Sequence, residues 1–129
     1  MGSLAVGFGA AVVCYLAVTL FKPAMGYDDS LDVFGIHGVG GVLGTIATGI
    51  FAVGALSATA ANPAGTSGLL EGNSAQLQIQ LIGVGVTIVW CGVLTFVVLK
   101  VVDLLVGLRV SPDAERMGLD VTQHGEALQ

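Results

Sequence analysis

The sequence predicts an all-α integral membrane protein with three transmembrane helices and a short cytoplasmic tail. Of its 129 residues, 54% are hydrophobic and only 10% are charged, whereas a soluble domain carries roughly 25% charged residues. The apolar residues gather at about residues 4–21, 33–56 and 77–106, and a helix needs about 20 such residues to cross a bilayer. Residues 1–106 therefore form the expected transmembrane region, and residues 107–129 form the expected tail.

The first apolar segment begins directly after Met1, without the basic region of a signal peptide, and is longer than a signal-peptide core of about 7–15 residues. We therefore interpret it as a membrane helix, closed by Lys22 and Pro23. The abrupt start suggests that the chain is the tail end of something larger. Between the second and third segments, residues 57–73 are rich in Ala, Gly, Ser and Thr, and Asn62-Pro63 indicates a turn.

The third segment reaches Val106 only if its helix continues through Lys100 and Asp103. It would then exceed a hydrocarbon core of about 30 Å, so it would tilt or project from the membrane. Orientation follows from the four bases: with three spans, all of them fall on one side, which the positive-inside rule assigns to the cytoplasm. The N-terminus is then outside and the tail inside. The four bases are Lys22, Lys100, Arg109 and Arg116.

The second segment carries an imidazole among small residues. On an α-helix, positions three and four apart share one face; the face that holds His37 also holds Val33, Gly41, Gly44 and Thr48. An ionisable group within a membrane segment usually marks a pathway, so this face suits a pore wall for a small neutral species, with His37 as its hydrogen-bonding group. The alternative is a structural histidine bonded to a carbonyl of a neighbouring helix.

Glycines in the same segment predict close helix packing. Gly40 and Gly44 form a small-xxx-small pattern, with Gly41 beside them, and such patterns let helix backbones approach each other. Three helices alone would leave such faces unpaired, which indicates a larger helical bundle.

Asp32 stands five residues before His37. Its ordinary interpretation is an acid that caps the helix start, while Asp28 and Asp29 would be solvated loop charges. Alternatively, the three acids attract a cation to the mouth of a path.

Other classes of site are not indicated. Nine acids and four bases leave no basic patch for nucleic acid. Cys14 and Cys91 have no CxxC neighbour, so neither a metal nor a cofactor is expected. No nucleophile, base and orienting group converge, so the chain is not expected to be an enzyme.

The tail is expected to be ordered locally. Ser111, Pro112 and Asp113 have the pattern of a helix start, and Gly118 is the expected stop. This pattern suggests a segment that docks on a partner, whereas His124 is expected to be solvated.

Several runs of residues resemble one family. Residues 28–38, DDSLDVFGIHG, resemble the penultimate membrane helix of the Amt/MEP/Rh family of ammonium transporters, and residues 87–90, TIVW, look like its last helix. The tail is similar to that of the bacterial branch, at residues 106–109, 115–120 and 124–126. The likeness covers essentially the whole chain, but only the last three helices of the family's bundle.

This resemblance implies a multi-pass protein of the inner membrane that acts as a homotrimer, with a pore for ammonium or ammonia in each subunit. His37 matches the second of two paired pore histidines, Val33 a hydrophobic pore position, and Asp32 the acid ahead of them. The tail would contact neighbouring subunits and a P-II-type regulatory protein, through the residues Arg109, Glu115, Gly118, Asp120, His124 and Glu126.

The recruitment site, the aromatic gate and the first histidine belong to earlier helices of the family, which this chain lacks. The leading hypothesis is therefore a C-terminal segment that conducts ammonia only together with the remaining helices. The alternative is a small, non-transporting three-helix membrane protein that binds partner helices, as the glycine-rich faces also allow.

Overall fold

The computed structural model describes residues 2–126, and every regular element in this range is a helix or a helical turn. Three helices are long and apolar enough to cross a membrane: Gly2–Met25, Phe34–Phe51 and Ser74–Leu105. These helices confirm the predicted all-α class with three candidate spans. The elements are α1 (Gly2–Leu16), η1 (Ala17–Phe21), α2 (Lys22–Met25), η2 (Phe34–Gly38), α3 (Val39–Phe51), α4 (Gly54–Ser57), η3 (Leu69–Glu71), α5 (Ser74–Leu105), α6 (Pro112–Met117) and η4 (Asp120–His124).

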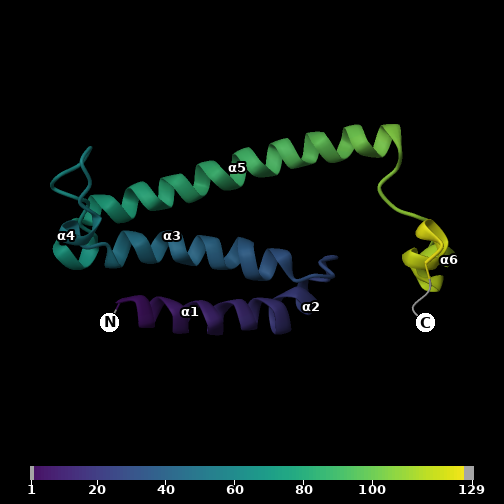
Figure 1. Cartoon of the computed structure of the whole chain (residues 1–129), viewed down its shortest axis with the longest axis horizontal. Helices are drawn as coiled ribbons and strands as arrows, with labels where there is room; N and C mark the ends of the chain where they lie inside the picture. The colour runs from purple at the N-terminus through teal and green to yellow at the C-terminus, as the bar shows by residue number, and fades with distance from the viewer. Residues whose placement is uncertain (1, 127–129) are drawn as a thin grey trace. The chain divides into compact units, whose positions relative to one another are not determined.

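The chain divides into two compact units, Met1–Thr87 and Ile88–Gln129. In the first unit, α1 and α3 lie side by side (Figure 1). A Cβ added to any of three glycines would lie 2.7 to 3.3 Å from a side chain of the other helix. The three contacts run in opposite order along the two helices, which makes them antiparallel: Gly2 with Phe51, Cys14 with Gly40, and Val18 with Gly35.

The first helix continues past Lys22 and Pro23, which we expected to close the span. η1 is a π-helical turn, in which the Lys22 N–H donates to the carbonyl of Ala17, five residues back. Proline lacks the N–H that an α-helix needs and crowds the preceding turn, and this wide turn accommodates it. The helix ends where Gly26 takes a left-handed φ of 63°. The position of the membrane boundary stays a prediction.

The segment after α3 folds back onto the end of that helix. α3 ends at Phe51, five residues before the predicted end of the second span, because Ala52 leaves the helical conformation. The Gly68 N–H donates to the Ala52 carbonyl at 2.7 Å. A Cβ on Gly68 would lie 2.8 Å from Ala52 N and 2.8 Å from the Ile50 carbonyl. Only glycine therefore fits at this position.

Glu71, the last residue of η3, forms a hydrogen bond with the start of α4. Its carboxylate accepts a hydrogen bond from the Gly54 N–H at 2.8 Å. This bond, and a second one from the Ser67 hydroxyl, lower the pKa of Glu71 below its ordinary value of 4.5. The charged form is favoured because both bonds are made to the ionised carboxylate.

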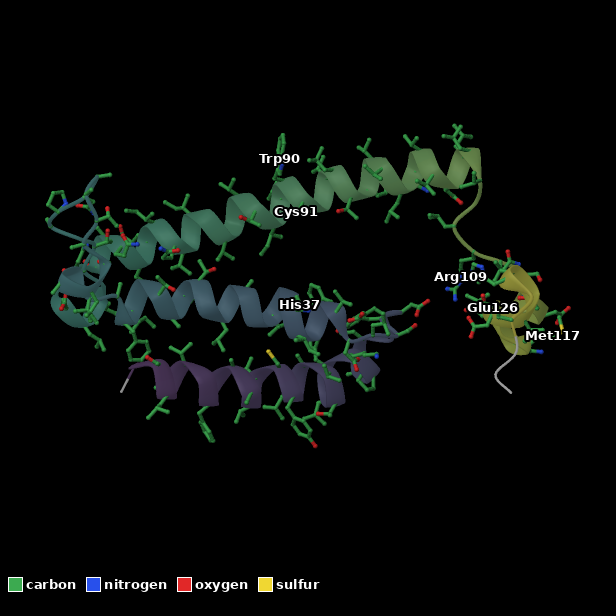
Figure 2. All side chains as sticks on the ribbon, viewed as in Figure 1. His37, Trp90, Cys91, Arg109, Met117 and Glu126 are labelled. Atoms are coloured by element: carbon green, nitrogen blue, oxygen red, sulfur yellow. The ribbon has the colours of Figure 1, made fainter. Side chains whose placement is uncertain are left out.

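The second unit contains the end of α5 and the tail. α5 continues through Lys100 and Asp103 to Leu105, so the predicted long third helix is confirmed. None of its side chains is buried among the described residues, and Figure 2 shows Trp90 projecting outward from it. The predicted helix in the tail is also confirmed: Ser111 Oγ accepts a hydrogen bond from the Ala114 N–H at 3.3 Å, and α6 ends before Gly118.

The described residues form almost no core of their own. Ala17 and Ala47 are the buried hydrophobic residues within residues 2–126. Close contacts at small residues, hydrogen bonds, an ion pair and aromatic contacts hold the first unit together.

We predict that Gly68→Ala destabilises the chain by about 1–3 kcal/mol, the usual cost of overpacking, because the new methyl group meets backbone atoms. Gly85→Ala is the matched control, since a Cβ there meets nothing within 4 Å. Thermal unfolding in detergent, followed by circular dichroism, compares the two variants. Equal unfolding temperatures would contradict the expected clash.

The lowered pKa of Glu71 predicts a pH dependence of stability. Because the folded-state pKa lies below the unfolded value, the carboxylate contributes stability above about pH 5 and loses this contribution as the pH falls through about 4 and below. Glu71→Gln should lower the unfolding temperature at pH 7, and the difference from the native chain should shrink at pH 3. A constant difference across this range would rule out the ionised carboxylate as its cause.

Candidate functional site

His37 lies in η2, the π-helical turn at the start of the second long helix (Figure 2). The turn is wide: the Val39 N–H donates to the carbonyl of Phe34, five residues back. Such turns are rare and occur frequently at functional sites. The His37 side chain is exposed, and within residues 2–126 no hydrogen bond or ion pair is found for its imidazole.

The residues expected on the His37 face lie on an open surface. Val33, His37, Gly41 and Thr48 are exposed and Gly44 is half-buried. A Cβ added to Gly41 or Gly44 would meet nothing within 4 Å, whereas Gly40 lies against Cys14 of α1. Of the three glycines expected to pack helices, Gly40 thus meets a helix of this chain, and the other two face open space among the described residues.

Val33 and His37 remain on roughly one face of the helix. Four residues make slightly more than one α-helical turn and slightly less than one turn of the wider π-helix. Since the wide turn covers Phe34–Gly38, it changes the side to which the two positions are offset and does not separate them. The sequence pattern carried no sign of this wide turn.

The start of η2 is held by an acid other than the expected one. Asp29 accepts hydrogen bonds from the N–H groups of Val33 and Phe34, each at 2.9 Å. The interpretation of Asp32 as the cap was therefore wrong, as was that of Asp29 as a plain loop charge. Asp32 instead forms an ion pair with Lys22, with Nζ 2.6 Å from Oδ1. Asp32 directly precedes the helix, but the loop turns back before the helix begins. This turn brings Asp29, not Asp32, to the first N–H groups.

Lys22 joins both acids. Its ammonium donates to the Asp29 carbonyl oxygen at 2.5 Å as well as to Asp32. The sequence indicates this lysine as an end of the first span and a sign of orientation, but not as a partner of the two acids. Ten residues separate Lys22 from Asp32, so only the antiparallel arrangement of the two helices could bring them together.

Aromatic rings fill the space beside this cluster. Tyr27 packs against Phe21, with ring centroids 6.5 Å apart, and edge-on against Phe34, at 5.7 Å. The Tyr27 hydroxyl is buried and has no hydrogen-bond partner among the described residues. The loop between the first two long helices is therefore packed against both of them.

In the tail, the structure brings together two of the expected regulatory residues. Arg109 forms an ion pair with Glu115, with Nη2 2.7 Å from Oε1, and both side chains are largely exposed. Gly118 has a positive φ of 95°, and Asp120 and His124 begin and end the π-helical turn η4. The Gly125 N–H closes this turn on the Asp120 carbonyl, and the Glu126 N–H donates to the same carbonyl at 2.9 Å. Within residues 2–126, no group of three or more His, Cys, Asp or Glu side chains could hold a metal ion.

The fold and this site define an α-helical membrane protein with an imidazole on one open helix face. The family model described as "Ammonium Transporter Family" matches residues 1–128. The chain therefore belongs to the ammonium transporter family.

Relatives at 41–50% identity agree with this assignment. An ammonium transporter of Aquifex aeolicus is 48% identical over 98% of this chain and 28% of its own length. A putative ammonium transporter of Methanothermobacter thermautotrophicus is 50% identical over 96% of this chain and 30% of its own length. An ammonium transporter of Bacillus subtilis is 41% identical, also over 96% and 30%. The chain thus spans less than a third of these relatives.

We predict that Asp29→Ala lowers the free energy of unfolding by about 1–2 kcal/mol, the usual cost of a lost helix cap, because two backbone N–H groups lose their acceptor. Ser30→Ala, one residue later on the exposed loop, is the control and should change it by less than about 0.5 kcal/mol. Equilibrium unfolding in mixed micelles compares the two. Equal effects of both substitutions would show that the cap contributes nothing.

Proposed function

We propose that this chain forms the C-terminal part of an ammonia-conducting pore, with the His37 face as part of the conduit wall. The observation that carries the proposal is a lone imidazole on an open face of small and apolar residues, in a chain of the ammonium transporter family. The relatives named above are ammonium transporters, which supports ammonium or ammonia as the substrate.

The chemistry of the face suits a small neutral molecule. A charged ammonium ion is costly to move through an apolar conduit, so it leaves its proton on water at the outer mouth and passes as ammonia. An imidazole has two ring nitrogens, so the His37 side chain can form a hydrogen bond with ammonia. Val33 supplies apolar wall, and a second histidine from another helix completes the pair.

The open faces call for partner helices. A Cβ added to Gly41 or Gly44 would meet nothing within 4 Å among the described residues, and small residues at a membrane-helix surface serve close helix contacts. We infer that the remaining helices of the same transporter cover them, in a homotrimer. Family membership favours this arrangement over a separate three-helix protein that binds unrelated partners.

The tail supplies the regulatory part of the proposal. Four bases fall on one side of the three spans, so the tail lies on the cytoplasmic side of the inner membrane and the N-terminus of this segment lies outside. The capped α6 and the Arg109–Glu115 ion pair give the tail local order. Such order suits docking on neighbouring subunits and on a P-II-type protein.

The test uses a chimera, in which the chain replaces the segment that it matches in the Aquifex aeolicus relative. Uptake of ammonium by proteoliposomes should fall about tenfold or more with His37→Ala and with His37→Leu, since the loss of one hydrogen bond of about 1.4 kcal/mol corresponds to a factor of ten.

Gln78→Ala, at an exposed position of α5, serves as the control and should leave uptake unchanged. Unchanged uptake with both His37 variants would overturn the role of the imidazole. A chimera that takes up no ammonium although it assembles normally would count against the whole proposal.

A further inference from the structure

We propose that Lys22 is a positioning residue, which ties the end of the first membrane helix to the start of the His37 turn and so sets the direction of the imidazole. Its importance for transport rests on the proposed function, whereas its structural part does not.

Lys22 contacts both groups that begin the His37 helix. Its ammonium lies 2.6 Å from Asp32 Oδ1 and 2.5 Å from the Asp29 carbonyl oxygen. Asp29 in turn accepts the first two N–H groups of that helix. The Lys22 side chain therefore contacts two residues at the start of the second helix: Asp29, which caps it, and Asp32, which directly precedes it.

Asp32 depends on such support. It is the non-glycine residue with a positive φ, 57°, within the described part of the chain. Asp and Asn enter this left-handed region more readily than other residues, but the region remains unfavourable for them. The Asp32 carbonyl accepts the Ile36 N–H at 3.0 Å, so the conformation of Asp32 also determines where the first helical hydrogen bond forms.

Because His37 lies in the π-turn η2, its direction depends on how the helix begins at Asp32. If the π-turn reverted to an α-turn, the residues before it would rotate by about 100° relative to those after it, because 3.6 residues complete a turn. Two contacts with the first helix hold the turn itself. Gly35 is buried, and a Cβ there would lie 2.7 Å from Val18 Cγ2, while the Cys14 thiol donates to the Ile36 carbonyl at 3.7 Å.

The ion pair is not an ordinary surface pair. The side chains of Lys22 and Asp32 are 26% and 32% exposed, against 63% and 51% for the tail pair of Arg109 and Glu115. Fully exposed pairs contribute little to stability because water and side-chain entropy oppose them. The partial burial of Lys22, together with its second bond to a backbone carbonyl, is what a positioning role requires.

The chain also offers a matched control. Lys100 lies near the C-terminal end of α5, and its ammonium lies 5.8 Å from the centre of the Phe96 ring. Lys100→Met removes the same charge as Lys22→Met and likewise keeps an unbranched apolar side chain, but it leaves the start of the His37 helix intact. A role of Lys22 limited to membrane orientation would make the two variants equivalent.

The first experiment measures backbone hydrogen exchange of the full chain in lipid nanodiscs. Lys22→Met should speed exchange of the amides of residues 33–38 by about tenfold or more, the effect of losing a hydrogen bond to a charged group. Lys22→Arg, which keeps the charge, should restore most of the protection, and Lys100→Met should change these amides less than about twofold. Native exchange in Lys22→Met, or an equal acceleration throughout α5, would overturn the proposal.

The second experiment asks whether Lys22 acts through His37 in the chimera described above. Lys22→Met should lower ammonium uptake about tenfold when His37 is present, but less than about twofold in a His37→Ala background, because coupled residues are not additive. Equal losses in both backgrounds would overturn a positioning role. A native chimera without uptake would defeat the proposed function alone, since hydrogen exchange still decides whether Lys22 holds the turn.

Discussion

Close approach of the first two long helices is the constraint on which the site depends. Their contacts pass through positions without a Cβ or with a short side chain, above all Gly35 against Val18 and Gly40 against Cys14. In a membrane, lipid tails are as apolar as leucine, so helices associate through close packing and hydrogen bonds. Small residues permit both, and here they bring two π-helical turns, η1 and η2, into contact. The imidazole sits in the second of these turns.

Acidic side chains complete the backbone hydrogen bonding at both ends of this helical pair. Asp29 accepts the free N–H groups at the start of η2, and Glu71 accepts that of Gly54 at the start of α4. Both carboxylates come from outside the helix that they serve. Each therefore fixes the position of a loop as well as the end of a helix.

Sequence reasoning reached the class, the three candidate spans and the tail helix, because apolar length and the Ser111-Pro112 pattern are local signals. It also singled out His37, which is conspicuous as an ionisable residue in an uncharged segment. It missed the π-turns, since hydrophobic periodicity does not register one extra residue in a turn. The roles of Asp29, Asp32 and Lys22 were also out of reach, because each depends on a contact between separate elements. Of the three glycines expected to pack helices, only Gly40 meets another helix within the described residues, and sequence spacing alone could not distinguish it from Gly41 and Gly44.

The scarcity of buried side chains has a consequence for biogenesis. Ala17 and Ala47 are the buried hydrophobic residues in the described part of the chain, so its helices gain little from shielding one another from water. Each can stand in lipid with its apolar side chains exposed, because the bilayer itself solvates them. Insertion into the membrane and association with further helices are therefore separable steps. The hairpin of the first two helices, joined by the Lys22 and Asp29 contacts, is the part that can form its native contacts before any other helix arrives.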